Sequence, residues 1–214
     1  LDLYSSEAPT QQERVSPLAS DNLSYLIYTS GSTGSPKGAG NTHRGSCNLI
    51  CTLVEKRKLS EGAKALQFQS FSFDASFAEI MTALCSGATL ILVASEAMRI
   101  DPVALGDFIL EQQVTHAHIP PVLLPEISPK DLESLRVLIV AGEACPPSVV
   151  TRFAANRDML NEYGPTEASV CVTITQALDP AMDPLGMVPI GQPVLNTQIY
   201  ILDGALNPLP VGMA

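Results

Sequence analysis

The sequence predicts an α/β fold in which helices flank a mainly parallel sheet, with the start of a β-rich segment at the C-terminal end. Apolar, strand-like runs alternate with amphipathic or capped stretches from Tyr25 onward. The runs at residues 88–93 and 137–141 are apolar throughout, which is typical of parallel strands covered on both faces. From Gln176 this rhythm gives way to repeated prolines and turn residues, which indicate short strands and turns.

These patterns divide the chain into three regions. Residues 1–22 are rich in Ser, Pro, Gln and Glu and lack periodicity, so we expect a linker or arm. Residues 23–175 are expected to form the α/β core subdomain. Residues 176–214 are expected to form a β-rich segment that leads into a further part of the domain.

Within the core, each expected element follows from its own residues. The apolar run at 25–29 predicts the first core strand, and the Gly/Ser-rich stretch after it predicts a loop. An amphipathic stretch at 45–56 predicts a helix, and apolar residues at 65–69 predict the next strand. The same reasoning gives, in chain order, a helix at 76–85, a strand at 88–94, a helix at 102–113, strands at 114–119 and 136–141, and a helix at 146–155.

The position of a ligand site follows from this topology. Parallel sheets bind ligands beyond the carboxyl ends of their strands. The loops after Thr29, Gln69, Ile119 and Ala141 are therefore where we expect the chemistry.

The first of these loops carries the sharpest local signal. Residues 29–38 read T-S-G-S-T-G-S-P-K-G, which is the composition of a phosphate-binding loop. Glycines let backbone N–H groups turn toward an anion, hydroxyls add donors, and Lys37 adds a compact positive charge. It is not a Walker A loop, because Pro36 precedes the lysine and Gly38 follows it. A flexible Gly/Ser turn is the alternative interpretation.

Charge and hydropathy exclude several classes of function. The 12 Lys and Arg residues against 22 Asp and Glu give a net charge of −10, so the overall field repels nucleic acids and anionic membranes. No apolar run reaches the roughly 18 residues that cross a bilayer. The first twenty residues do not resemble a secretory signal or a transit peptide, and we expect a cytoplasmic protein.

Metal-ligating patterns are weak. The five cysteines are scattered, with no C-x-x-C pair and no His at ligand spacing, which favours free thiols over a zinc site. His116 and His118 are two apart on an expected strand and point the same way, but the sequence shows no third ligand.

Four segments together carry a family resemblance. They are residues 28–38 with the following His43-Arg44, F-D-A-S at 73–76, A-G-E-A at 141–144, and N-E-Y-G-P-T-E at 161–167. In order and spacing they resemble an amino-acid adenylation domain of a nonribosomal peptide synthetase, a member of the adenylate-forming superfamily. The resemblance implies the flavodoxin-like subdomain of these enzymes and covers the chain from about residue 16.

The resemblance implies carboxylate activation. A substrate carboxylate attacks the α-phosphate of ATP, pyrophosphate leaves, and the aminoacyl adenylate is held until the phosphopantetheine thiol of a carrier protein takes it. A peptidyl carrier protein and a condensation domain are the implied partners, and ATP and Mg²⁺ the implied cofactors. Thr166 and Glu167 carry over as the α-phosphate contact and the Mg²⁺ ligand. For Glu167 the alternative is a solvated turn carboxylate.

The resemblance also assigns the nucleotide contacts. The β- and γ-phosphates fall to the first loop, namely Thr29, Ser30, Gly31, Ser32, Thr33, Gly34 and Lys37. Tyr163 is expected to stack on adenine next to Gly164, with Gly142, Glu143 and Ala144 walling the purine.

Asp74 is the residue that the resemblance assigns to the substrate α-ammonium group. A structural role competes with it, because Asp74 precedes a helix and Ser76 to Glu79 matches a capping box. The capping box accounts for Ser76 and Glu79 without accounting for Asp74.

The family's substrate-pocket positions carry over onto nine residues, namely Asp74, Ala75, Ala78, His118, Ile139, Ala141, Glu162, Val170 and Cys171. The small Ala78 and the apolar walls favour a large side chain. Glu162 is costly to bury unpaired, so we expect His118 or a donor on the substrate to satisfy it. A tyrosine-like substrate fits these requirements, and a basic side chain facing Glu162 is the second choice.

Two alternatives stay open. One is an acyl- or aryl-CoA ligase of the same superfamily, against which Asp74 argues. The other is a catalytically inactive excised subdomain, because the family's ribose-binding Asp and catalytic lysine have no counterpart here, and we expect these 214 residues alone to be inactive. The sequence also departs from the family at Ala39 and Gly40, where two small residues should weaken a strand.

Overall fold

The computed structural model describes residues 7, 10–30, 34–93, 95–179, 181, 186–210 and 212–213. Its central sheet is built, in chain order, from β3 (Lys64–Gln67), β4 (Thr89–Leu92), β5 (His116–His118), β6 (Val137–Ala141), β7 (Asp158–Tyr163), β8 (Thr173–Ile174) and β9 (Gln192–Pro193). Within the described residues these seven strands lie in the order β4-β3-β5-β6-β7-β8-β9. The first five in that order are parallel, and β8 and β9 are antiparallel additions. The expected mainly parallel sheet is confirmed.

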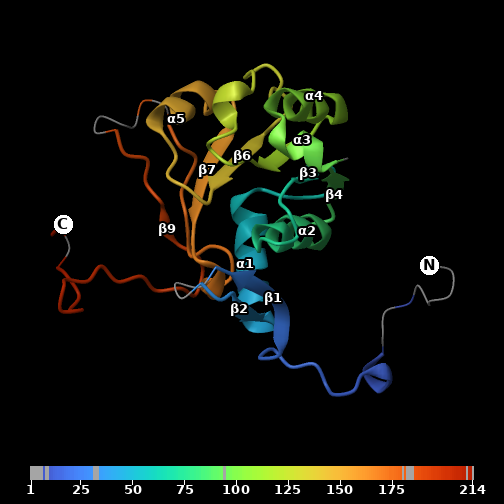
Figure 1. Ribbon diagram of the computed structural model, residues 1–214, viewed down its shortest axis with the longest axis vertical. Coiled ribbons are helices and arrows are strands. Elements are labelled where there is room, and N and C mark those ends of the chain that lie inside the picture. The colour runs from blue at the N-terminus through green and yellow to red at the C-terminus, as the bar shows by residue number, and fades with distance from the viewer. Residues whose placement is uncertain are drawn as a thin grey trace.

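Helices cover both faces of this sheet (Figure 1). They are α1 (His43–Lys56), α2 (Ala75–Cys85), α3 (Glu96–Ile100), α4 (Pro102–Gln112) and α5 (Pro147–Phe153), with 3₁₀ turns at η1 (Gln11–Glu13), η2 (Leu124–Glu126) and η3 (Thr166–Ala168). Residues of α1 and α2 pack on one face, and residues of α4 and α5 pack on the other.

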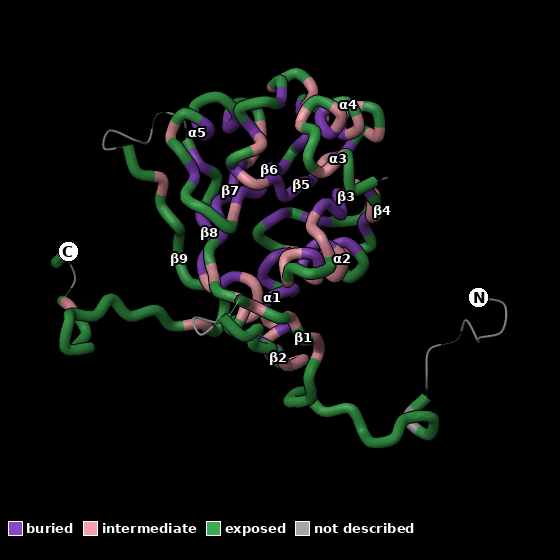
Figure 2. Tube along the Cα trace, viewed as in Figure 1, coloured by how far each residue is buried: buried purple, intermediate pink, exposed green. Residues whose placement is uncertain are grey.

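The strand β6 shows why the sheet is buried on both sides. Successive side chains of a strand point to opposite faces. Val137 and Ile139 therefore join the core under α1 and α2, while Leu138 and Val140 join the core under α4 and α5. Figure 2 shows this burial along the central strands and exposed chain toward both ends.

The first expected core strand lies outside the parallel sheet. Residues 23–29 form β1 (Leu23–Thr29), which pairs antiparallel with β2 (Lys37–Thr42) in a separate two-stranded ribbon. The expectation that Thr29 ends a parallel strand is therefore wrong. The small residues of β2 suit this ribbon, since a Cβ on Gly40 would come within 2.9 Å of Cδ2 of Leu23 and that side chain would have to shift.

The run at 88–93 is also less covered than expected. Its strand, β4, is the edge of the sheet, and Leu92 is 61% exposed. Apolar residues alone did not distinguish an edge strand from a central one, because an edge position depends on how the other strands order themselves.

The remaining expected elements appear within a few residues of their expected bounds. The strand β7 and the short helix α3 were not expected. Residues 176–214 contribute β9 and an isolated bridge between Leu202 and Pro208 among the residues described. No helix in the described part of the chain is both long and apolar enough to span a membrane.

Candidate active site

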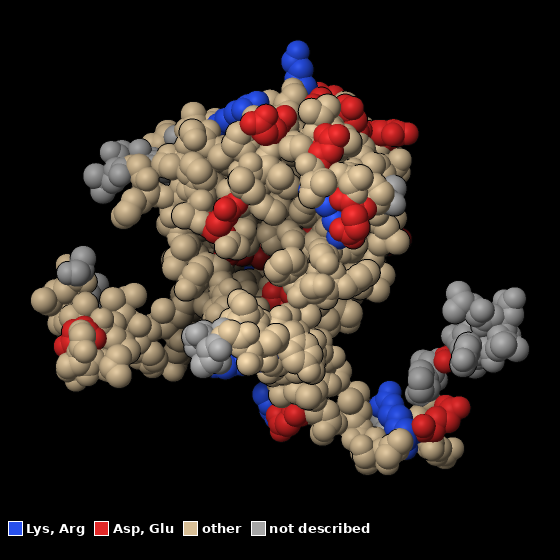
Figure 3. Space-filling model, viewed as in Figure 1, with Lys and Arg blue, Asp and Glu red and all other residues tan. Residues whose placement is uncertain are grey.

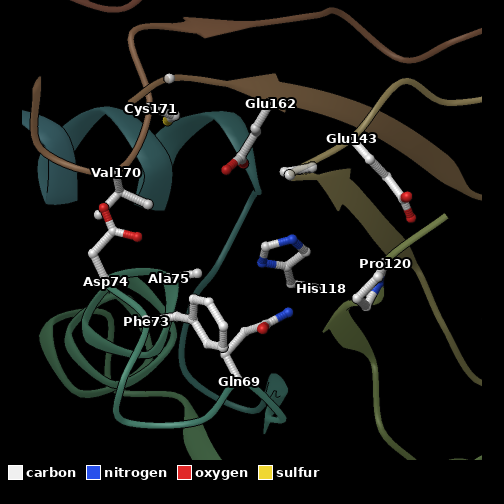
Figure 4. Close-up of a pocket in the computed structure, with 13 residues that line it drawn as sticks. Gln69, Phe73, Asp74, Ala75, His118, Pro120, Glu143, Glu162, Val170 and Cys171 are labelled. Atoms are coloured by element: carbon white, nitrogen blue, oxygen red, sulfur yellow. The ribbon is translucent and has the colours of Figure 1, made fainter. Parts of the chain in front are cut away.

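A cavity of about 310 Å³ opens at the carboxyl ends of the parallel strands. The ends of three neighbouring strands contribute His118 from β5, Ala141 from β6 and Glu162 from β7. The strands are in register there, with Ala141 paired to Glu162 and His118 to Ile139. In the view of Figure 4, Asp74 and Val170 lie on one side of the cavity, Glu143 lies on the other, and the His118 ring lies between them.

Three of the four loops in which we expected chemistry meet here. Gln69, Pro120 and Gly142, which follow β3, β5 and β6, all line the cavity. The loop after Thr29 does not supply a described lining residue, in keeping with its place in the separate ribbon.

Seven of the nine residues expected in a substrate pocket line this cavity, namely Asp74, Ala75, His118, Ala141, Glu162, Val170 and Cys171. The structure does not bring Ala78 and Ile139 to it. Ala78 is buried in the core between α1, α2 and the sheet. Ile139 lines a much smaller inner cavity, of about 10 Å³, behind His118.

Asp74 lines the cavity and does not act as a conventional cap of its own helix. Asp74 stands at the N-cap position of α2, but its side chain makes no capping hydrogen bond. Its Oδ2 is buried without a hydrogen-bond partner. Burial raises the pKa of Asp74, and the Thr166 hydroxyl partly opposes this shift. A buried carboxylate oxygen without a donor is suited to receive a cation.

The expected capping box is wrong. Ser76 lies inside α2 and its hydroxyl donates to the carbonyl of Phe73, at 2.7 Å. Glu79 is buried, and its Oε2 accepts from the N–H groups of Phe68 and Gln69, at 3.0 and 2.9 Å. Burial raises the pKa of Glu79 to about 8. Glu79 therefore ties α2 to the end of β3 instead of capping the helix.

Glu162 finds a partner that the sequence did not indicate. Arg57, at the C-terminal end of α1, donates from Nε to Oε1 of Glu162 at 2.9 Å and from Nη2 to Oε2 at 2.7 Å. Both side chains are almost completely buried, with 4% and 2% exposed. The expectation that His118 or a substrate donor satisfies this carboxylate is wrong, because Arg57 already binds both oxygens.

The two histidines face the same side of the sheet, as their spacing indicated. Burial lowers the pKa of both His116 and His118 to about 4, so both are neutral at pH 7. The Nε2 atoms of both rings are buried without a hydrogen-bond partner, and both residues line the small inner cavity. Among the described residues no group of three or more His, Cys, Asp or Glu could hold a metal ion.

A second cavity, of about 480 Å³, adjoins the first. It is lined by the five residues that we expected around adenine, namely Gly142, Glu143, Ala144, Tyr163 and Gly164. The two cavities share Gly142, Glu143, Glu162 and Gly164 as walls. The chain thus places a large two-part space along the ends of β6 and β7.

The turn that carries Thr166 and Glu167 is held by the ribbon. The Asn41 amide of β2 donates to the carbonyl of Thr166 at 3.0 Å. The Glu167 side chain is exposed, and its charge contributes to the raised pKa of Asp74. A carboxylate at this position has the oxygen chemistry of a Mg²⁺ ligand, and Mg²⁺ commonly takes one or two carboxylates together with substrate phosphates.

The expected phosphate loop is partly described. Gly31, Ser32 and Thr33 lie outside the described residues. Thr29 pairs with Lys37 at the end of the ribbon that the loop joins, and its hydroxyl donates to the Lys37 carbonyl at 3.4 Å. Ser30 is exposed, and Gly34 has a positive φ of 82° that suits a glycine.

The charge distribution agrees with a small-molecule site. Figure 3 shows acidic side chains within the central hollow of the face in view and no single basic patch over it. Together with the net charge of −10, this argues against a nucleic-acid surface.

The chain is similar to known proteins over most of its length. The family model described as "AMP-binding enzyme" matches residues 2–214. The chain is 41% identical over 203 residues to "Probable non-canonical nonribosomal peptide synthetase (NRPS) CymA" of Salinispora arenicola, covering 95% of this chain and 2% of that protein. It is 41% identical over 203 residues to "Novobiocin biosynthesis protein H" of Streptomyces niveus, covering 95% of this chain and 33% of that protein.

A solved structure shows the same fold. The Klebsiella oxytoca NpsA N-terminal subdomain in complex with 3-hydroxyanthranilyl-AMSN is 28% identical, with a TM-score of 0.78, and the match covers 95% of this chain and 54% of that one. The chain spans a third or less of the length of the two curated relatives described above.

Proposed function

The chain belongs to the family of AMP-binding enzymes, and on that premise we propose that it activates the carboxylate of an amino acid with ATP. The observation that carries this proposal is Asp74, whose unpartnered Oδ2 lies at a cavity that adjoins the space lined by Tyr163 and Gly142. A cation-binding carboxylate beside a nucleotide-sized space is what an enzyme needs to hold an amino acid and ATP together.

The reaction joins two substrates. The substrate carboxylate attacks the α-phosphorus of ATP, the bond to the β-phosphate oxygen breaks, and pyrophosphate leaves. The product is an aminoacyl adenylate. Catalysis of this kind rests on positioning and on charge stabilisation.

Each expected residue takes one part in this proposal. Asp74 binds the α-ammonium group and so orients the carboxylate. Thr166, whose hydroxyl lies beside Asp74, contacts the α-phosphate. The first loop, from Thr29 to Lys37, holds the β- and γ-phosphates and then the pyrophosphate. Tyr163 stacks on adenine against the wall at residues 142–144.

Glu167 is the residue that would hold Mg²⁺. When bound, the ion neutralises negative charge on the phosphates. Its exposed carboxylate, on the same short turn as Thr166, supports this assignment.

The partners follow from the kind of protein to which the chain is similar. One relative is named as a nonribosomal peptide synthetase and another as a novobiocin biosynthesis protein. We propose that a phosphopantetheine thiol on a carrier protein accepts the aminoacyl group and that a condensation domain uses it. The cavity of about 310 Å³ favours a large, tyrosine-like side chain over glycine or alanine.

The test is ATP–pyrophosphate exchange by the full-length protein that contains these residues, measured with each common amino acid and without any. Exchange that depends on an amino acid supports the proposal. Exchange that is equally fast with matched carboxylic acids lacking the amine would indicate an acyl- or aryl-CoA ligase instead. Preference for glycine or alanine would contradict the interpretation of the cavity.

A further inference from the structure

The inner end of the cavity of about 310 Å³ is closed by a pair of opposite charges. Glu162 lines the cavity, and Arg57 lies behind it, lining the smaller inner cavity. The two residues are 105 positions apart, and two hydrogen bonds, of 2.9 and 2.7 Å, join them. This fork geometry is the strongest and most directional form of a side-chain ion pair.

The pair leaves the inner end without net charge. A cationic substrate side chain facing Glu162 would compete with a guanidinium that already binds both oxygens. If the substrate displaced it, Arg57 would be left buried and unpaired, which is costly. Arg57 thus lowers the affinity of the site for basic side chains. Specificity commonly depends on such unfavourable interactions with the wrong ligand.

Anionic side chains are disfavoured as well. The acidic groups that face the cavity are Asp74, Glu143 and Glu162. Glu143 is exposed and accepts from the Val122 N–H at 2.9 Å. Among the residues that the structure describes around this cavity, none is Lys or Arg.

Neutral hydrogen-bonding groups remain at the inner end. The His118 ring is more than nine-tenths buried and lies within the cavity in Figure 4, and its Nε2 has no hydrogen-bond partner. Burial holds this imidazole uncharged. The Cys171 thiol is also buried at this wall, and burial raises its pKa, so it too is uncharged at pH 7.

We propose that Arg57 is a specificity-determining positioning residue, which holds Glu162 so that the site selects an amino acid whose side chain is uncharged and can form a hydrogen bond. The inference rests on the proposed activation of an amino acid and names its substrate class. It excludes the basic side chain that Glu162 alone would favour.

The experiment compares three forms of the full-length protein with the unchanged protein. Arg57→Met removes the guanidinium, and Arg57→Met combined with Glu162→Gln makes the inner end neutral again. Lys58→Met is the matched control, because Lys58 is the next residue, and its exposed cation pairs with Asp158 away from the cavity. Amino-acid-dependent exchange is measured with tyrosine, phenylalanine, glutamine, lysine, arginine and glutamate, together with the shift in Tm that each amino acid produces.

We expect the unchanged protein to prefer an uncharged polar side chain to lysine and arginine. Arg57→Met should lower kcat/KM for the preferred amino acid by about tenfold or more, mainly through KM, and raise the relative activity with lysine or arginine by a similar factor. The double variant should recover the preference for uncharged side chains, and Lys58→Met should change kcat/KM by less than about twofold.

Two outcomes would overturn the inference while leaving amino-acid activation in place. They are preference of the unchanged protein for lysine, arginine or glutamate, and an unchanged ranking of side chains in folded Arg57→Met. If Arg57→Met does not fold, Glu162→Gln is measured instead. This variant leaves the positive charge of Arg57 unpaired, so we expect it to raise the relative activity with glutamate. An unchanged relative activity with glutamate would contradict the inference. If no amino acid supports exchange, the proposed function fails, and the Tm shifts then decide the inference by themselves. Absence of any shift overturns both.

Discussion

The side-chain oxygen of Asn41 accepts hydrogen bonds from both the backbone N–H and the hydroxyl of Ser169, at 3.1 and 3.0 Å, across 128 positions of the chain. Its amide nitrogen donates to the carbonyl of Thr166. One buried side chain of β2 therefore fixes the turn that carries Thr166 and Glu167. The strand after the first loop and the turn expected at the α-phosphate are held together as one unit.

Asn41→Ala should destabilise the fold by about 1–3 kcal/mol, because it leaves partly buried backbone groups of the turn without partners. It should also slow amino-acid-dependent exchange by about tenfold, since Thr166 loses its support. Urea unfolding and exchange kinetics of the full-length protein measure both effects. Asn48→Ala is the control, because its bonds to Leu195 and Asn196 lie outside the cavities. Equal exchange rates in the two variants would contradict a positioning role for Asn41.

Asp74→Ala should lower kcat/KM for the preferred amino acid by roughly 100-fold, because the α-ammonium group is left without its counter-charge in a half-buried site. Activation of the matched acid that lacks the amine should fall much less. The comparison needs only exchange rates with the two ligands. Equal losses for both would show that Asp74 does not bind the amine.

Glu167→Gln should reduce exchange by about 100-fold at limiting Mg²⁺ and less at saturating Mg²⁺, because an amide is a weaker Mg²⁺ ligand than a carboxylate. Unfolding should barely change, since the side chain is exposed. Glu61→Gln removes another exposed carboxylate, in the segment before β3, and serves as the control. Near-full activity of Glu167→Gln at limiting Mg²⁺ would refute the assignment.

Gly164→Ala should damage both cavities at once. A Cβ on Gly164 would lie 2.4 Å from Cα of Cys171 and 2.7 Å from the nitrogen of Val172, so the backbone must shift. We expect a loss of about 1–3 kcal/mol in stability and higher KM values for both ATP and the amino acid. Gly204→Ala is the control, because its Cβ would meet nothing within 4 Å. A change in only one of the two KM values would contradict the view that Gly164 shapes both cavities.

Stability should pass through a maximum near pH 6.5. The pKa of His116 and His118 is lowered to about 4, so the unfolded chain binds more protons than the folded one below pH 6.5, and stability falls as the pH drops from 6.5 toward 4. The pKa of Glu79 is raised to about 8, so the folded state keeps a proton that the unfolded chain releases above about pH 4.5. The contribution of Glu79 to the free energy of unfolding therefore declines between pH 4.5 and 8.

Above pH 6.5 the histidines no longer add stability as the pH rises. The free energy of unfolding should therefore fall because of Glu79, by up to about 1.4 kcal/mol per pH unit. Urea unfolding at pH 5 to 8.5 measures the curve, and Glu79→Gln should flatten its alkaline side. A variant with an unchanged slope between pH 6.5 and 8 would show that Glu79 titrates normally.

The sequence indicated the parts of this fold that depend on neighbours along the chain. Apolar runs located β3, β5 and β6, and the strand–loop rule placed Gln69, Pro120 and Gly142 at the cavity. β7 was missed because its inward-facing Glu162 and its Asn161 are polar, and their burial depends on partners elsewhere.

The contacts that could not be predicted join residues far apart in the sequence. Arg57 binds Glu162 across 105 positions of the chain. It lies in a charged stretch at the end of α1, and nothing in the local sequence predicts that its side chain is buried. Glu79 fits a capping pattern by spacing, but its carboxylate accepts instead from the backbone N–H groups of Phe68 and Gln69, after β3. The position of β1 outside the parallel sheet depends on its pairing with β2. The apolar residues of β1 alone do not predict that pairing.

The separate ribbon has a dynamic consequence. Among the described residues β1 and β2 pair only with each other, so the ribbon can open without breaking any strand pair of the seven-stranded sheet. Amide protons at its loop end, at Thr29 and Lys37, should therefore exchange with solvent through local fluctuations, while those of β6 exchange only on global unfolding. The segment that we expect to bind the phosphates thus has its own opening equilibrium, separate from that of the sheet that shapes the cavity proposed for the amino acid.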